Sequence, residues 1–593
     1  MINSGPINSQ PLNALGWGAA TEPEAPEVPE APEVPVEPEE TTPVEMPEGH
    51  AFRWSAIIKL GGADVSELLT GAVRIDREEG ASGIAEFSLF YPQGIPVTPD
   101  LSDRTVTIDY VTDDGQNSQQ VRLFTGLVAE PSWDAPTRVM RIAATDNLQQ
   151  RIEAMSVEQV DQLTQGVWSE DVFRSTEGRS RWDYAQERMA SRLASLDCSP
   201  SGELRTTSWY STTAPRYIFD NDTTVYQSIN VDLAQLRNVT NRVEIDFSYR
   251  YQRLHEASIK YTWLHPGTGG AGSISGFCAW RSMTSELPST DMVVEATESA
   301  GLTALNRNWY SLPPTMSDPC GTGAPWINNN TDLLLGAQWT GARRWAQTVT
   351  ENYKLNLSTE AGIIAGQQVI SRTGASANID SADADDWSSS LKQADAAGVA
   401  GDRSDDARRA AAINCLLLIA RSEIIDAHRK TRVSWEVPTS MALGVDLSHT
   451  IEINDQMTRA QAKCSRRIDI LDFDTGSALT GITISVMRGT GASDVLQPPP
   501  RIGANDAKDY GGNWGALVSL GTQLGGRFIS PTYNESLDGF AGNSDARQDD
   551  TLEVFPRRLA ISAPEVPEQF TSEKKHEAAH DYLIGIPNDL LEL

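Results

Sequence analysis

The residues with the clearest chemical potential are two histidines four positions apart, in the run H-E-A-A-H at 576–580. The pattern from Ser572 to Tyr582 predicts a helix, and residues four apart on a helix share one face. Two imidazoles on one face can bind zinc while a glutamate between them acts as a general base. His576, Glu577 and His580 are therefore the candidate metal-site residues of this chain.

The neighbours of this motif argue against a metal site. Lys574 and Lys575 stand directly before it, where zinc-dependent hydrolases bury an apolar helix, and Asp581 follows directly after it. A third zinc ligand would have to be Glu592 or a residue from elsewhere in the chain. We therefore predict a solvated amphipathic helix with two exposed histidines and no need for zinc.

Other catalytic signatures are missing from the sequence. It contains no G-x-S-x-G nucleophile elbow, no Walker loop and no dinucleotide-binding fingerprint. Its 81 acidic residues guarantee many carboxylate pairs, so a glycosidase pair stays open. Trp309, Trp326 and Trp339 could line a glycan site, but core packing is the favoured role in a chain with 15 Trp. We predict no catalytic residue and no cofactor.

Charge and length restrict the classes of partner. The chain has 593 residues and a formal net charge of −33, so its surface as a whole cannot grip nucleic acid or an anionic membrane. The strongly apolar run Cys415 to Ala420 is too short to span a bilayer. The first five residues carry no secretory signal pattern. This length predicts several domains.

Cysteine usage predicts the redox state. The five cysteines are widely scattered and form no C-x-x-C pair, and their number is odd. We expect free, buried thiols made in a reducing compartment, and no iron–sulfur cluster. They are Cys198, Cys278, Cys320, Cys415 and Cys464.

The N-terminal fifty residues predict two extended segments. Residues 1–20 form a small, polar arm, and residues 21–50 form a linker dominated by Pro and Glu, in which A-P-E-V-P occurs twice. Proline favours the polyproline II conformation and like charges keep the segment extended, so about thirty residues can reach about 90 Å. The linker is a disordered spacer or a tether for a distant neighbour. The motif returns at 563–568, which predicts a second extended arm.

A first β unit is predicted over 51–155. Runs of alternating apolar residues predict six or seven strands with turns between them, the last one over Arg138 to Thr145. Asp146 is placed to cap a following helix, with Gln149 completing a capping-box-like pair. The strand before the last runs from Val121 to Ala129, and the Pro131 region marks the turn after it.

The middle of the chain is more varied. Residues 156–240 predict a mixed α/β domain with a helix over Trp182 to Leu196. Residues 241–264 alternate as a long hairpin that turns near His255, and 265–405 read as an insertion domain rich in Gly, Ser, Asn and Trp. A long helix capped by Asp405 or Asp406 is predicted over 406–430. Three strands within 431–490 complete a second β unit with 241–264, and 491–593 form a C-terminal region.

Two stretches resemble the hub proteins of bacteriophage tails. The first is F-T-G-L-V at 124–128 followed by R-I-A-A-T-D and a helix, and the second is the strand series V-D-L-S-H-T-I-E-I at 445–453 with the strand after it, where Ala462 replaces the family's glycine. The resemblance implies an α+β, mainly β fold with two tail-tube-like barrels, interrupted by helical and irregular insertions.

The same resemblance implies a function and partners. The chain would be a structural hub of the tail tip or baseplate in the virion, made in the host cytoplasm. It would form a homotrimer that joins the sixfold tail tube or distal tail ring to a threefold spike or fibre, and contact the host envelope indirectly. DNA would pass through its channel without specific binding. A tail-associated cell-wall hydrolase and a receptor-binding protein that uses 265–405 are the alternatives.

Overall fold

The structure is a computed structural model, and it describes most of the chain from residue 53 onward. The two predicted N-terminal segments, 1–20 and 21–50, lie outside the described residues apart from Pro43. The described ranges are 53–97, 100–113, 118–234, 239–265, 287–312, 320–321, 332–360, 371–378, 401–503, 517–523, 533–542 and 557–593, with 514.

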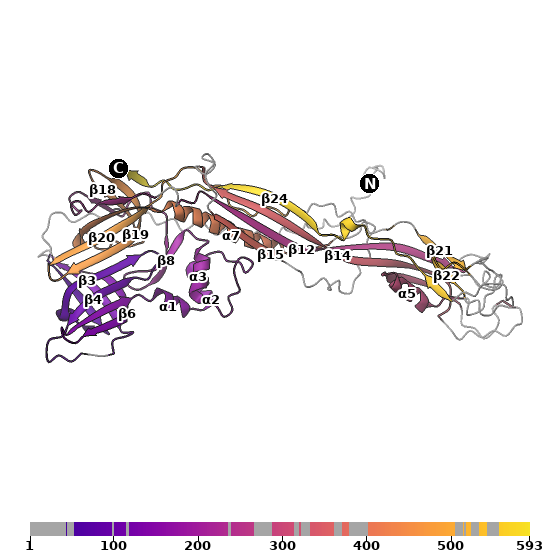
Figure 1. The fold of residues 1–593 in the computed structure, drawn as a ribbon, viewed down its shortest axis with the longest axis horizontal. Coiled ribbons are helices and arrows are strands. Elements are labelled where there is room, and N and C mark those ends of the chain that lie inside the picture. The colour runs from indigo at the N-terminus through magenta and orange to yellow at the C-terminus, as the bar shows by residue number, and fades with distance from the viewer. Residues whose placement is uncertain are drawn as a thin grey trace, which may run out of the picture.

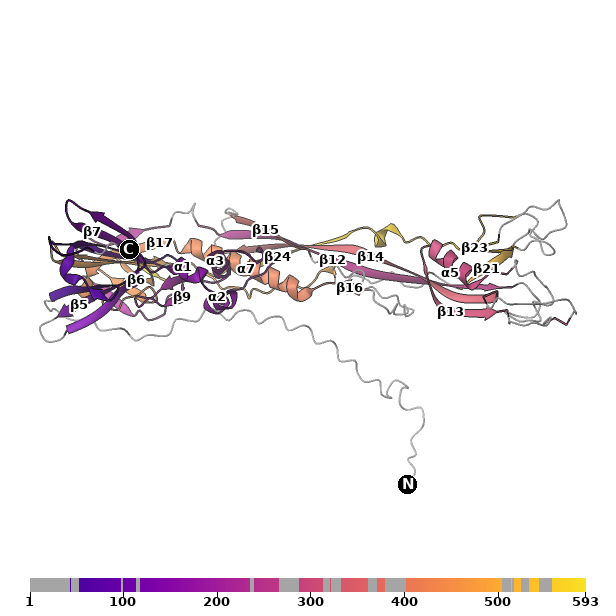
Figure 2. The same ribbon diagram turned by 90° about the horizontal axis from the view of Figure 1, so that it is seen from below.

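The molecule is elongated, with its β-rich bulk at one end and a smaller module at the other (Figures 1 and 2). Within the described residues the strands form a 14-stranded sheet, a nine-stranded sheet and one separate pair. The prediction of a mainly β, α+β fold is confirmed. No helix in the described ranges combines the length and apolar character needed to cross a membrane.

The first half of the large sheet, here the first half-barrel, follows the predicted β unit closely. Side chains facing inward along each strand, such as Ile75, Phe87 and Ile108, are at most 3% exposed. The strands run in the order β3-β4-β7-β6-β5-β1-β2. Their bounds are β1 (Arg53–Leu60), β2 (Ala63–Asp64), β3 (Leu69–Glu78), β4 (Ile84–Phe90), β5 (Thr105–Asp113), β6 (Ser118–Asp134) and β7 (Val139–Thr145), with a 3-10 turn η2 (Ser66–Leu68).

Strand β6 ends later than the predicted strand, which stopped at Ala129. It continues through Pro131, which lies opposite Ile142, and the turn comes only after Asp134. A register shift between Val128 and Glu130 accommodates the proline segment in the ladder. Gly126 in the same strand has a steric reason: a Cβ there would lie 2.4 Å from the Thr145 carbonyl oxygen.

The helix after β7 begins differently from the prediction. Helix α1 (Leu148–Glu153) has Asn147 at its N-cap, in the left-handed region and without a side-chain cap bond. Asp146 instead bridges two backbones, because its carboxylate accepts from Leu148 N at 3.1 Å and from Gly83 N at 2.7 Å. A true capping box occurs one helix later, between Ser156 and Gln159.

The region after α1 is a small mixed layer, whereas 217–220 and 230–232 of the predicted domain 156–240 join the large sheet instead. Helix α2 (Val157–Thr164) and helix α3 (Arg181–Met189) pack beside the hairpin of β8 (Ala194–Cys198) and β9 (Leu204–Ser208). The predicted helix over Trp182 to Leu196 therefore ends early, because Ala194 to Cys198 pair with β9 instead.

The second half of the large sheet, here the second half-barrel, is assembled from distant segments. Its strands run β11-β17-β20-β19, with β10 and β18 continuing beside β19 and with β25 also on β19. Antiparallel pairing of β19 with β3 joins it to the first half-barrel. The bounds are β10 (Tyr217–Asp220), β11 (Asn230–Asp232), β17 (Thr431–Pro438), β18 (Thr450–Asn454), β19 (Arg459–Asp472), β20 (Ser477–Val486) and β25 (Leu590–Glu592), with η6 (Thr439–Met441).

Residues 241–264 do not belong to this second unit, which corrects the predicted domain. They form one uninterrupted strand, β12 (Arg242–Leu264), instead of a hairpin turning near His255. Strand β12 pairs along its whole length with β14 (Leu334–Ser358). The segment predicted as a separate insertion, 265–405, therefore supplies the partner strand of β12, and the two form a long ribbon (Figure 1).

Helix α7 (Asp406–His428) covers the barrel-proximal part of this ribbon. Asp405 caps it as predicted, accepting from Arg408 N at 2.9 Å. Its residues are buried on several sides, because it packs on the aromatic face of β12 and also contacts the layer around α3. Strands β15 (Ser371–Asn378) and β16 (Gly401–Arg403) also pair with β12, so further parts of the predicted insertion 265–405 belong to the sheet of the ribbon.

The far end of the ribbon carries a distal module. It contains helix α5 (Thr290–Ser299) and strands β13 (Thr303–Ser311), β21 (Val518–Gln523), β22 (Gly539–Ala541) and β23 (Arg558–Ala560). The chain then returns along the ribbon through η8 (Glu568–Phe570) and β24 (Lys574–Leu583), and ends with β25 on the second half-barrel.

Candidate functional site

The histidine motif lies in a strand, which overturns the predicted helix. Residues 574–583 form β24, parallel to β14, with His576 opposite Glu351 and His580 opposite Leu355. Residues four apart in a strand are separated by about 13 Å, and zinc needs its nitrogen ligands at about 2 Å. These two imidazoles therefore cannot share one zinc ion. Among the described residues, no three His, Cys, Asp or Glu side chains are grouped to hold a metal.

The three tryptophans considered for a glycan site have different positions. Trp339 is 2% exposed in the distal core, and its indole Nε1 donates to Thr297 Oγ1 at 3.0 Å. Trp309 packs against it with ring centroids 6.3 Å apart. Trp326 lies outside the described residues. Trp339 is thus a core residue, in agreement with the favoured interpretation.

The prediction that all cysteines are free thiols is wrong for one of the four that the structure describes. Cys198, Cys415 and Cys464 are free and buried. Cys320 in the distal module is disulfide-bonded, whereas all five were expected as thiols. Spacing along the sequence carries no information on which cysteines are neighbours in space, so this disulfide bond could not be predicted. Cys278 lies outside the described residues.

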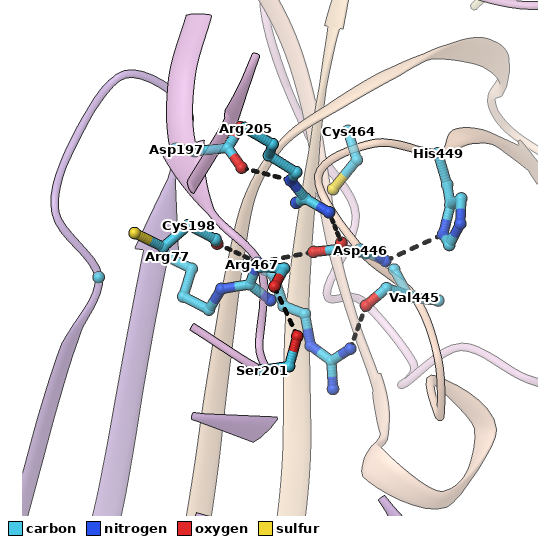
Figure 3. Close-up of polar contacts among 12 residues, drawn as sticks. Arg77, Asp197, Cys198, Ser201, Arg205, Val445, Asp446, His449, Cys464 and Arg467 are labelled. Carbon is cyan, nitrogen blue, oxygen red and sulfur yellow. Dashed lines mark hydrogen bonds and ion pairs between the residues drawn. The ribbon is translucent and has the colours of Figure 1, made fainter. Parts of the chain in front are cut away.

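A dense arrangement of polar side chains lies at the junction between the two half-barrels (Figure 3). Asp446, in the loop before β18, accepts hydrogen bonds from two arginines: Arg77 of β3 at 2.6 Å and Arg205 of β9 at 2.5 Å. We call Arg77, Asp446 and Arg205 the junction triad. Three segments far apart in the sequence meet in this triad: the first half-barrel, the β8–β9 hairpin and the second half-barrel.

The triad is extended on both sides by further hydrogen bonds. Arg77 also donates to the Cys198 carbonyl oxygen at 3.1 Å, and Arg205 donates to Asp197 at 2.7 Å. The backbone N–H of Asp446 donates to Nδ1 of His449 at 3.1 Å, which requires that nitrogen to be unprotonated. Every charge of the triad therefore has an oppositely charged partner, as buried charges require.

The electrostatics of the junction follow from burial and pairing. Burial alone raises the pKa of Asp446, but the charge of Arg77 and the bonds from Arg205 outweigh it, so the pKa lies well below its usual value. Burial lowers the pKa of His449 to about 4 and keeps the ring neutral. Burial also lowers the pKa of Lys463 to about 8 and raises that of the Cys464 thiol to about 12.

A second buried pair lies next to the triad on β19. Arg467 donates to Asp469 on the same strand at 2.9 Å and to the Val445 carbonyl oxygen, and both side chains are at most 3% exposed. Thr480 of β20 completes the carboxylate shell by donating to Asp469 at 2.7 Å. This pair orients the loop that carries Asp446.

The solvent side of the same seam carries a more exposed ion pair. Arg466 of β19 donates to both oxygens of Asp76 on β3, at 2.9 and 2.7 Å. A further buried pair joins Arg429 after α7 to Glu79: Arg429 donates at 2.6 Å, and its guanidinium lies 4.7 Å from the ring centroid of Trp209. Charged side chains therefore line both faces of the β3–β19 contact.

The ion pairs of this junction are suited to holding the two half-barrels together. Buried ion pairs add little net stability compared with apolar packing, but they impose a unique geometry, because breaking one pair strands the other charge. The thiols there are protonated at neutral pH, and His449 is tied to the Asp446 backbone. The arrangement holds two half-barrels in one relative orientation.

Sequence reasoning did not single out the junction residues, although a signal for them exists. Arg77, Lys463 and Arg467 are at most 4% exposed within β-strands, at positions where neighbouring strands place apolar residues. Charged residues at inward positions of a strand are rare and need partners. The partner of Arg77, Asp446, lies 369 residues away, so pattern could not pair the two, whereas the partner of Arg467, Asp469, is on the same strand.

Comparisons with known proteins give structural likeness only. No family model matches the chain, and no curated protein matches its sequence. The fold is similar to a tail protein from Neisseria meningitidis MC58, with 9% identity, a TM-score of 0.36, and coverage of 73% of this chain and 96% of that one. It is similar to the 43 kDa tail protein of prophage MuSo2 from Shewanella oneidensis, with 11% identity, a TM-score of 0.35, and coverage of 72% and 97%.

A third similar structure is the prophage tail protein gp18 from Listeria monocytogenes EGD-e. It shares 6% identity at a TM-score of 0.31, with coverage of 73% of this chain and 94% of that one. These three similar structures are tail proteins, and two of them are from prophages.

Proposed function

We propose that this protein is a structural hub of a bacteriophage tail tip or baseplate, and that it acts without catalysis. The observation that carries the proposal is the β3–β19 pairing, which fuses two half-barrels into one sheet within a single chain. Three such chains in a closed ring present six half-barrels. A ring of this kind matches a sixfold tube on one side and a threefold spike on the other.

The ends of the large sheet support assembly with neighbours. Its strand path ends in β2 and β11, which have only two and three residues. Tyr226 and Leu233, which flank β11, are 88% and 54% exposed, and Met457 in the turn after β18 is 83% exposed. Open sheet edges with exposed apolar residues invite pairing with another chain. We assign the β11 edge to the contact between copies.

The elongated shape gives the chain two separate contact regions. The half-barrels lie at one end, and the distal module lies at the other end of the ribbon (Figure 1). In this proposal the half-barrels join the tail tube or distal tail ring, and the ribbon carries the module toward tip or fibre proteins. DNA passes the ring without specific binding, because a chain with net charge −33 does not attract phosphate.

Mass measurement of the assembled species tests the proposal. We expect the full chain to form trimers at micromolar concentration in light scattering coupled to size exclusion. Tyr226→Asp with Leu233→Asp should shift the population toward monomer by placing charges in the contact. Val495→Asp is the matched control, because Val495 is 73% exposed after β20 and lies outside the β11 edge. A wild-type monomer in assembled tails would refute the hub.

A further inference from the structure

A groove in the distal module has the form of a peptide-binding site. It has a volume of about 600 Å³ and lies between α5 and β23. Five consecutive residues, 557–561, line one side of it. Side chains of a strand alternate between its two faces, so five consecutive residues line a groove only where the strand edge faces it.

Within the part of the chain that the structure describes, no strand lies beside this strand edge. Among the described residues, β23 is the last strand on its path and pairs on one side only, with β22. The main chain of Leu559 is held in place because the Leu559 and Ile561 side chains pack against the distal core. An ordered edge strand without a neighbour is a template for a further strand.

Helix α5 forms the opposite wall with one of its flanks. Val293 and Thr297 face the core and are at most 1% exposed, which places the helix on the sheet. Met292, Ala296 and Ser299 line the groove, with spacings of four and three residues that put them in one row. Ala296 and Ala300 are small, so an extended chain has room beside the strand edge.

Two arginines and one carboxylate line the groove, and the carboxylate is the group that suits a basic side chain of an occupant. The guanidinium groups of Arg557 and Arg558 are directed at neighbouring segments: Arg557 donates to Leu287 O at 3.0 Å, and Arg558 donates to Glu535 O at 2.8 Å. Glu295 is exposed on the groove wall, and no ion pair within the described ranges involves it. A lysine or arginine of the occupant would complete this carboxylate.

We propose that this groove binds an extended segment of a partner protein by adding a strand to β23. The segment carries small apolar side chains against Ala296 and Ala300, and a basic residue at Glu295. The chain's own linker at 21–50 does not fit this role. Its prolines recur every third residue from Pro23 to Pro38, so hydrogen-bond donors are missing from any edge-facing register.

The experiment uses the full chain and a yeast-displayed library of random short peptides. Selected peptides should contain a basic residue, and their binding should slow hydrogen exchange of the 558–561 amides. Glu295→Lys should weaken them about tenfold, because it replaces an attraction by a repulsion. Glu298→Lys makes the same charge change on the same exposed helix outside the groove lining, and should leave binding unchanged.

A second variant tests the groove itself. Ala296→Trp fills the space beside the strand edge and should abolish binding, while unchanged thermal unfolding shows that the module is intact. Three results would each overturn the proposal: no peptide is selected, selected peptides bind both variants as well as wild type, or binding leaves the 558–561 amides unprotected. The half-barrels take no part in this site, so failure here leaves the proposed hub untouched.

Discussion

The two half-barrels differ in how their strands are connected along the chain and in which side chains they bury. The first is built from one continuous stretch, 53–145, and its core is mostly apolar: among the described residues of its strands, the buried charged side chains are those of Arg77 in β3 and Asp109 in β5. The second collects its strands from 217–232, 431–486 and 590–592, and carries buried charges such as Lys463 and Arg467 beside its apolar core. Hairpins align neighbouring strands through short turns. Distant segments lack that constraint, and here buried ion pairs provide specific alignment.

The seam between them combines both strategies. Leu471 of β19 belongs to the core of the first half-barrel, and the indole Nε1 of Trp54 donates to the Gly476 carbonyl oxygen at 3.0 Å. On the other side of the seam, the junction triad holds β3 to the loop before β18. The comparison predicts that charge removal damages the second half-barrel most, and that steric change damages the first.

The largest effect is expected from breaking the junction triad. Asp446→Ala leaves Arg77 buried without its carboxylate and removes one of two partners of Arg205. We expect the free energy of unfolding to fall by about 3–5 kcal/mol. Urea denaturation measures this free energy of unfolding. Glu130→Gln, at an exposed position of β6, is the control. A loss below that of the control would show that the triad does not hold the half-barrels together.

Acid should destabilise the protein through His449. Its folded pKa is about 4, below the usual value near 6.5, so between these pH values the unfolded chain binds more protons. Stability therefore falls as pH decreases from about 6.5 to about 4, by up to about 3 kcal/mol. The difference in unfolding free energy between wild type and His449→Gln, followed against pH, isolates this contribution.

The first half-barrel supplies the comparison for this pH dependence. It contains no histidine within 53–145, so none of this loss arises from its own imidazoles. A difference curve that stays flat between pH 6.5 and 4 would mean that His449 is not held neutral in the folded state.

A steric change should show the sensitivity of the first half-barrel. Gly126→Ala places a Cβ 2.4 Å from the Thr145 carbonyl oxygen, so β7 or β6 must shift. We expect destabilisation by about 1–3 kcal/mol in thermal unfolding, typical of overpacking. Gly481→Ala is the matched control in the second half-barrel, because its nearest neighbour atom would be 3.8 Å away. Equal losses for both variants would contradict the steric explanation.

The smallest effect is expected on the solvent side of the seam. Arg466→Ala removes the paired bonds to Asp76, but the Arg466 side chain is 34% exposed and that of Asp76 is 21% exposed. Water and salt screen such pairs, so we expect a loss of about 0.5–1 kcal/mol that shrinks in high salt. A loss as large as that of Asp446→Ala would remove the distinction between buried and exposed pairs across this seam.

Whether a feature of this fold could be predicted depends on how far apart in the sequence the residues that form it lie. The six main strands of the first half-barrel and helix α7 with its Asp405 cap are legible from local periodicity, because neighbours in sequence are neighbours in space. The partner of β12 was not predictable, since β14 starts about seventy residues later and alternation along β12 also fits a hairpin. The junction triad was missed for the same reason.

The sequence by itself determined the mainly β character, the buried faces of the strands and the start of the long helix, because these depend on alternation and capping within a few residues. Tertiary structure decided the rest. The segment 574–583 has the composition of a helix, yet it is the strand β24, because the edge of β14 offers it a full row of backbone partners. That pairing also separates His576 from His580, so the apparent metal motif has no shared site.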